Sequence, residues 1–170
     1  MTLAIGLFLA IVLIFAATAF KGAPYIPTHK ASLDVLFNEL IDVSSDDLLI
    51  DIGSGDGVVL RMAASRGART LGYEINPLMV VVSKLLSLKY GKCVRVELAD
   101  FWKAKFPEAT TIVYTFGESR DIQKMFDKVQ SEATRLNKTL RFVSYGFTSD
   151  SHEPIASKSA MTVYAVAPLQ

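Results

Sequence analysis

Residues 48–57, with the sequence Leu-Leu-Ile-Asp-Ile-Gly-Ser-Gly-Asp-Gly, constrain the fold more than any other part of this chain. The apolar run is typical of a strand that is buried on both faces of a parallel sheet. Glycine reaches backbone dihedrals that other residues avoid and lets a ligand lie against the main chain. Residues 58–64 then have the pattern of a helix whose first amides would point at that ligand. The segment predicts a strand, a tight turn and a helix around a bound molecule.

The rest of the chain alternates between strand-like and amphipathic helical segments. This alternation predicts an α/β fold with a Rossmann-like open, mostly parallel sheet of six or seven strands and helices on both faces. The final strand is expected to pair antiparallel at the sheet edge. Strands are expected at 48–52, 70–75, 94–98, 110–116, 140–147 and 161–166, and helices at 32–41, 58–66, 78–90 and 122–136.

Three segments carry more specific expectations. The helix over 78–90 is apolar nearly all round, which predicts burial between the sheet and its neighbouring helices, with lipid contact as the alternative. Cys93 is the only cysteine of the 170 residues, so an internal disulfide is excluded. Its place in an alternating strand pattern predicts a buried structural thiol. Residues 148–158 are polar and are expected to form a loop.

The N-terminus is the other unusual feature. Leu3 to Phe20 carries no charge and would span about 27 Å as a helix, close to the thickness of a bilayer core. A cleaved signal peptide is the alternative, but no Lys or Arg precedes the apolar run. Lys21 and Lys30 follow it, which predicts a cytoplasmic C-terminal side, or the matrix side in a mitochondrion. We expect a single transmembrane anchor at 1–21, a linker at 22–31 and the folded domain at 32–170.

The glycine spacing is G-x-G-x-G, whereas the dinucleotide fingerprint is G-x-G-x-x-G. With Asp51 two residues before the first glycine, it resembles motif I of the class I methyltransferases that use S-adenosylmethionine. That molecule carries an ammonium group and no phosphate, so a carboxylate can bind it through a charge-assisted hydrogen bond. A glycine turn without a ligand and a nucleotide site of another kind are the alternatives.

Acidic and aromatic residues follow the next two strands. Glu74 ends the second strand, roughly 20 residues after the glycines, where a carboxylate can accept both ribose hydroxyls of an adenosine. Asp100, Phe101 and Trp102 end the third strand, where class I methyltransferases hold the adenine between apolar side chains. The alternative for Asp100 is a helix N-cap beside core aromatics.

Four segments together narrow the resemblance. In order and spacing they are similar to the membrane-anchored protein-lysine methyltransferases, the family that includes the ATP synthase c-subunit enzyme. The segments are Pro-Tyr-Ile-Pro-Thr at 24–28, the glycine motif at 51–57, Gly-Tyr-Glu-Ile-Asn-Pro at 72–77 and Asp-Phe-Trp-Lys at 100–103.

The resemblance implies S-adenosylmethionine as cofactor and a lysine of a membrane-embedded protein as methyl acceptor. It implies that the segment from Pro24 to Thr28 closes over the cofactor and lines a lysine channel. A narrow apolar channel would lower the pKa of the acceptor lysine, and our candidates for its wall are Tyr25 and Phe116. The residues that the resemblance implies in cofactor binding are Pro24, Tyr25, Pro27, Thr28, Asp51, Gly53, Ser54, Gly55, Gly57, Glu74, Asn76, Asp100, Phe101 and Trp102.

Other classes of function have less support in the sequence. A net charge of +1 gives no electrostatic footprint for nucleic acid. Metal-ligand spacing and acid–base pairs are not recognisable, so we expect neither a metal nor a dedicated general base. The strand over 110–116 lacks the Asn/Asp-Pro-Pro-Tyr ending of enzymes that methylate DNA base amines or glutamine. Two alternatives stay open: a small-molecule or lipid methyltransferase, and a membrane-bound S-adenosylmethionine-binding module without catalysis.

Overall fold

The alternating segments form one seven-stranded sheet in the computed structural model, which describes residues 5–6, 28–116, 121–149 and 151–169. The strands are β1 (Leu48–Ile52), β2 (Arg69–Glu74), β3 (Val94–Leu98), β4 (Ile112–Thr115), β5 (Leu140–Tyr145), β6 (Ala156–Lys158) and β7 (Met161–Val166). The helices are α2 (Lys30–Val35), α3 (Val58–Ala64), α4 (Pro77–Leu86) and α5 (Ile122–Leu136), with a π-helical turn η1 (Leu36–Leu40) and a 3₁₀ segment η2 (Leu88–Cys93).

The strand order is β3-β2-β1-β4-β5-β7-β6. Strands β1 to β5 run parallel, whereas β7 pairs antiparallel with both β5 and β6. Strand order reverses at β1, since β2 and β3 lie on one side of it and β4 on the other. In open α/β sheets, ligands bind beside the carboxyl ends of the strands at such a reversal.

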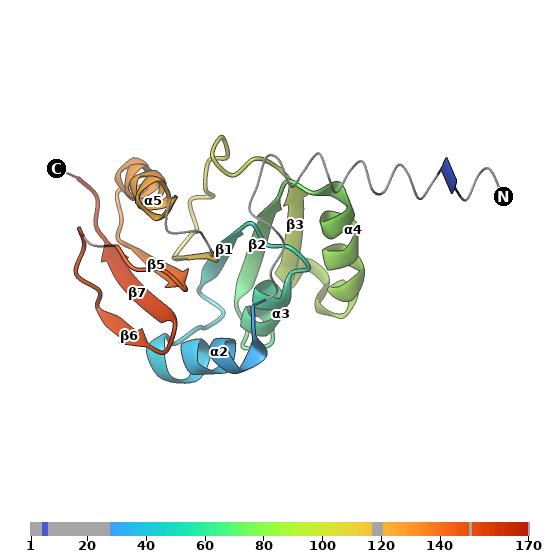
Figure 1. Ribbon diagram of the computed structural model, residues 1–170, viewed down its shortest axis with the longest axis horizontal. Coiled ribbons are helices and arrows are strands. Elements are labelled where there is room, and N and C mark those ends of the chain that lie inside the picture. Colours follow the sequence, from blue (N-terminus) through green and yellow to red (C-terminus); the bar gives the residue numbers. More distant parts are fainter. Residues whose placement is uncertain (1–4, 7–27, 117–120, 150, 170) are drawn as a thin grey trace.

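Two apolar layers enclose the sheet. Helices α2, α3 and α4 cover one face, where the core includes Leu36, Leu60 and Val80. Helix α5 covers the other face through Phe126 and Val129 (Figure 1). Strands β1, β4 and β5 therefore bury their side chains alternately into two different cores, as the apolar pattern of β1 predicts.

The predicted fold class and its parallel sheet are confirmed, with local corrections. The segment 148–158, expected to be a loop, contains β6, so β7 is an interior strand and not the edge. The helix expected over 78–90 ends at Leu86, and Gly91 breaks the 3₁₀ segment that follows with a φ of 55°. The prediction that Cys93 is buried is wrong: it is exposed at the end of η2.

The predicted burial of the helix over 78–90 is also wrong in part. Val81, Leu85 and Leu86 of α4 are between 51% and 62% exposed. The expected transmembrane anchor lies almost wholly outside the described residues and stays a prediction. Among the helices that the structure does describe, none has the length and apolar character needed to cross a bilayer.

Candidate functional site

The glycine turn lies between β1 and α3, at the reversal point of the sheet. Gly53, Gly55 and Gly57 adopt φ angles of 83°, 51° and 80°, in the left-handed region that side chains with a Cβ avoid. The amides of Gly53 and Ser54 donate to the Tyr73 carbonyl at 2.9 and 3.1 Å, which ties the turn to β2. The sequence prediction of a strand, a tight turn and a helix is confirmed.

Gly53 and Gly57 have different surroundings. A Cβ built on Gly53 would meet no atom of the described residues within 4 Å, so the main chain there faces open space among them. A Cβ on Gly57 would lie 2.2 Å from Ser83 Oγ, because α4 packs closely against the turn. The main chain at Gly53 is therefore accessible to a ligand, whereas Gly57 is required by packing.

Asp51 ends β1 with a buried carboxyl group, 3% exposed. Burial raises its pKa well above the usual value, and the nearby carboxylates of Glu74 and Asp56 raise it further. Within the described ranges, no basic side chain forms an ion pair with it. A buried carboxyl group in this setting is stabilised in its charged form by a cation, such as an ammonium group.

Glu74 is buried at the end of β2 and holds the glycine turn in place. One carboxylate oxygen accepts the Gly55 amide at 2.8 Å, and the other accepts the Asn76 amide at 2.7 Å. A carboxylate oxygen can accept more than one hydrogen bond, so this arrangement leaves capacity for ribose hydroxyls. Asn76 caps α4, since its side chain accepts the amides of Leu78 and Met79. The ribose contact itself stays a prediction.

The end of β3 lies beside Glu74, whose carbonyl accepts the Ala99 amide at 3.0 Å. Asp100 accepts the Trp102 amide at 3.1 Å and caps a short turn, not the helix that the alternative for this residue expects. The rings of Phe101 and Trp102 lie 4.4 Å apart, and Trp102 is 40% exposed. An exposed indole beside a carboxylate remains available to an adenine ring.

Two hydrogen bonds bring Tyr114, Ser32 and Tyr145 to the site, where the sequence does not predict them. The Thr28 and Tyr114 hydroxyls lie 3.3 Å apart and are buried, and the Ser32 and Tyr145 hydroxyls are also 3.3 Å apart. Tyr114 is the register partner of Asp51 on the neighbouring strand β4. Burial raises the pKa of Tyr114, and the Asp51 carboxylate raises it further. The hydroxyl of Tyr114 is therefore a neutral hydrogen-bonding group in the site.

Phe116 packs edge-on against Tyr145, with ring centroids 4.7 Å apart. The structure thus brings Thr28 and Phe116, both expected in the site, to the carboxyl ends of β4 and β5. Pro24, Tyr25 and Pro27 lie outside the described residues, so their contacts stay predictions. Ser54 is buried, and its hydroxyl has no hydrogen-bond partner in the described part of the chain.

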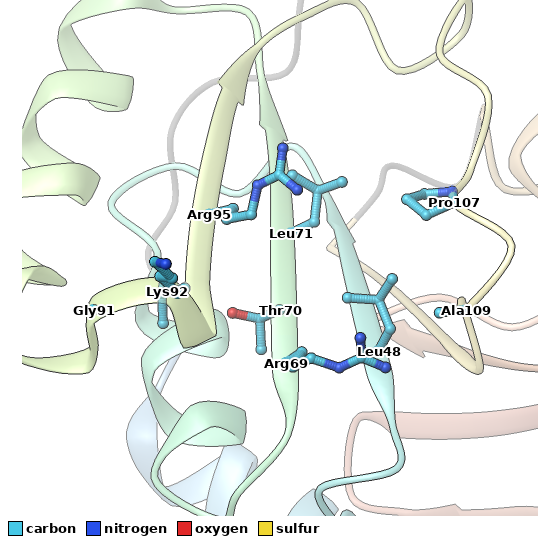
Figure 2. Close-up of a pocket in the computed structure, with 10 residues that line it drawn as sticks. Leu48, Arg69, Thr70, Leu71, Gly91, Lys92, Arg95, Pro107 and Ala109 are labelled. Carbon is cyan, nitrogen blue, oxygen red and sulfur yellow. The ribbon is translucent and has the colours of Figure 1, made fainter.

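A cavity of about 650 Å³ opens at the opposite end of the sheet (Figure 2). Leu48, Arg69 and Val94 line it, and they begin β1, β2 and β3. Its lining includes no residue of the expected site. The chemistry is therefore assigned to the carboxyl ends of the strands, where the glycine turn, Asp51 and Glu74 meet.

Comparison with known proteins identifies the type of domain. A family model described as the ANTKMT methyltransferase domain matches residues 51–156, well over half of the chain and including the whole glycine turn. The chain belongs to this family. Membership confirms the resemblance to the lysine methyltransferases, and the methyltransferases of this fold use S-adenosylmethionine.

Individual relatives agree with that assignment. The chain is 31% identical over 111 residues to the ATP synthase c-subunit lysine N-methyltransferase of Xenopus laevis, covering 64% of this chain and 48% of the relative. It is 33% identical over 86 residues to the protein of the same name from Homo sapiens, covering 49% and 36%. The chain thus spans less than half the length of both relatives.

A solved structure resembles the whole described domain. The RNA methyltransferase from Salinibacter ruber, crystallised with S-adenosyl-L-homocysteine, superposes with a TM-score of 0.69 at 27% identity. The match covers 84% of this chain and 94% of that one. The groups at the carboxyl ends of the strands fit such a ligand: a cation-compatible carboxyl group, open main chain at Gly53 and a second carboxylate 19 residues after Gly55.

Proposed function

We propose that this protein transfers a methyl group from S-adenosylmethionine to a lysine side chain of a membrane protein, such as the c-subunit of an ATP synthase. The observation that carries the proposal is the buried Asp51 carboxyl group beside an open glycine turn. The family match and the names of the relatives support the lysine substrate.

The chain's own residues would bind and orient the cofactor. Asp51 would accept a hydrogen bond from its α-ammonium group, which compensates the buried negative charge. Glu74 would hold the ribose while it keeps the glycine turn in place through the Gly55 amide. The turn leaves Gly53 bare, so the methionine part can lie along the backbone.

The acceptor amine must lose its proton before it reacts, because a free lysine has a pKa of about 10.4. When bound, the cofactor supplies a methyl group on a positively charged sulfur. The neutral amine would bond to the methyl carbon and displace the sulfur as the leaving group. Phe116, Tyr114 and Tyr145 provide an apolar wall at this point, and desolvation of the amine there lowers its pKa. Alignment in such a channel contributes several kcal/mol to the rate without a general base.

The membrane part of the proposal rests on the sequence. An uncharged segment from Leu3 to Phe20, followed by lysines, would place the domain on the cytoplasmic side of the membrane, or on the matrix side in a mitochondrion. Tethering would raise the effective concentration of a membrane-embedded substrate near the site.

The test is methyl transfer by the full chain from radiolabelled S-adenosylmethionine to membranes of its source, followed by separation into protein, lipid and RNA. The proposal expects label in a small membrane protein, with lysine methylation found by mass spectrometry. Label confined to the lipid or RNA fraction would assign a different acceptor. Binding of S-adenosylhomocysteine without any transfer would indicate a non-catalytic module. The Asp51→Asn variant is the control for enzyme-dependent label.

A further inference from the structure

Helix α4 buries Val80 and Ser83 but exposes several of its large apolar side chains. Ser83, on the face toward the sheet, is 0% exposed, whereas Leu85 and Leu86 are 62% and 51% exposed. Val81 and Leu85 lie four residues apart on one face of α4, Leu88 begins the 3₁₀ segment η2 that follows, and all three are more than half exposed. A surface helix of a water-soluble domain shows the opposite arrangement.

The residue at position 83, on the inward face of α4, is small because of its packing. Ser83 lies so close to the glycine turn that a Cβ on Gly57 would be 2.2 Å from its hydroxyl oxygen. That contact excludes a larger residue at position 83. It explains why a serine is buried, but it gives no reason for three leucines and a valine on the outside.

The charged residues in and next to this apolar segment are all basic. Lys84, Lys89 and Lys92 are exposed, and residues 75–96 contain no Asp or Glu. Helix α4 lies at one flank of the molecule beside β3, and no other labelled helix or strand lies outside it (Figure 1). Apolar side chains flanked by lysines, without acidic residues, are the composition of a helix that lies in a membrane interface.

The geometry points to a peripheral membrane-docking function for this surface: Val81, Leu85, Leu86 and Leu88 enter the interface of a bilayer, and Lys84, Lys89 and Lys92 bind anionic phospholipid headgroups. A second copy of the chain would bring the same lysines face to face. The uncharged segment from Leu3 to Phe20 offers no negative charge to them. An anionic lipid bilayer offers acyl chains to the apolar side chains and negative headgroups to the lysines.

Docking in this way would place the candidate site near the membrane. Helix α4 begins at Pro77, and the Asn76 amide before it donates to Glu74 in the site. Binding of this surface to lipid is measured without methyl transfer, so the result does not depend on which molecule receives the methyl group.

The test uses the full chain with Cys93→Ser and one new cysteine that carries an environment-sensitive fluorophore. Leu88→Cys reports on the surface, and Ile155→Cys is the matched control, since the two side chains are 73% and 61% exposed. The vesicles contain phosphatidylcholine with or without phosphatidylglycerol, plus a lipid with a nitroxide quencher on its acyl chain. We expect quenching at position 88 in the anionic vesicles and none at position 155.

Lys84→Gln and Lys89→Gln should each raise the concentration of anionic lipid that is needed for quenching, by about fivefold per lysine. Lys124→Gln, on α5, is the control and should change nothing. Three results would overturn the inference: no quenching at position 88 although the protein floats with the vesicles, equal quenching with and without phosphatidylglycerol, and an apolar emission at position 88 before vesicles are added. The last would show that protein already covers the surface.

Discussion

The hydroxyl groups of Thr28 and Tyr114 lie 3.3 Å apart although 86 residues separate them in the chain. This contact joins Thr28, two residues before α2, to the carboxyl end of β4, one strand from Asp51. It places the start of the domain over the reversal point of the sheet. The N-terminal segment that leads into α2 is therefore connected to the candidate site by a specific buried hydrogen bond.

Removing that bond should affect transfer more than cofactor binding. Tyr114→Phe leaves the Thr28 hydroxyl without its partner, at a cost of about 0.5–1.5 kcal/mol, which corresponds to up to about a tenfold loss in kcat/KM. The affinity for S-adenosylhomocysteine, measured by calorimetry, should stay unchanged. Tyr73→Phe is the control, because it removes a comparable bond to the Lys105 carbonyl on the other face. Equal losses in both variants would contradict a role for Tyr114 in the site.

Substitution of the two aspartates near opposite ends of β1 should have different effects: one should weaken cofactor binding and the other should leave binding unchanged. Asp51→Asn removes the charged partner of the ammonium group and should weaken S-adenosylhomocysteine binding by about 1.5–3 kcal/mol, or 10- to 100-fold. It should not lower the melting temperature, since burial already disfavours the charge. Asp47→Asn should leave binding unchanged. Normal binding by Asp51→Asn would show that the carboxyl group has no part in the site.

Binding should also depend on pH through Asp51. The pKa of this group in the free protein is raised, and the ammonium group of the ligand binds its ionised form. Affinity for S-adenosylhomocysteine should therefore fall as the pH decreases through that raised pKa, approaching tenfold per pH unit below it. Calorimetric titrations from about pH 7 to about pH 4.5 measure this, and the Asp51→Asn variant should give a flat profile over the same range.

Asp47 should contribute to stability above the ordinary carboxyl pKa. Burial alone would raise its pKa, but hydrogen bonds from Thr111 and the Ser44 amide and the Arg141 guanidinium group lower it below 3.8. A lowered pKa in the folded state adds stability above pH 3.8 that is lost as the pH falls through the lower folded value.

The Asp47→Asn variant measures the contribution of this carboxylate to the free energy of unfolding. At neutral pH, Asp47→Asn should lower the free energy of unfolding by about 1.5–3 kcal/mol, because a charged hydrogen-bond acceptor is lost. Denaturant unfolding of both proteins should show the difference shrinking below pH 3.8. A difference that persists unchanged in acid would mean that the ionised carboxylate is not the stabilising form.

Substitution by alanine should affect stability at Gly57 and ligand binding at Gly53. Gly57→Ala places a Cβ against Ser83, so it should cost more than the roughly 1–2 kcal/mol of left-handed strain alone. Gly53→Ala carries only that strain but projects into open space, so it should mainly weaken S-adenosylhomocysteine binding. Adding Ser83→Ala to Gly57→Ala should restore part of the lost stability. No recovery in thermal unfolding would contradict the contact.

The sequence predicts most of this fold because its strongest signals are local. The glycine motif, the apolar run of β1 and the Asn76-Pro77 helix start each determine backbone conformation within a few residues. The role of Tyr114 could not be predicted, since it depends on the register between β1 and β4 and on the distant Thr28. The predicted burial of α4 is wrong in part because helical periodicity does not show which face meets the sheet. The close approach of Gly57 to Ser83 decides that orientation.

The most direct test is a crystal structure of this protein with S-adenosylhomocysteine. We predict that the ligand's ammonium group lies within hydrogen-bonding distance of Asp51, that its ribose hydroxyls contact Glu74, and that its chain lies along Gly53. A ligand bound in the cavity at the amino ends of β1, β2 and β3, or one that does not contact the glycine turn, would contradict the account.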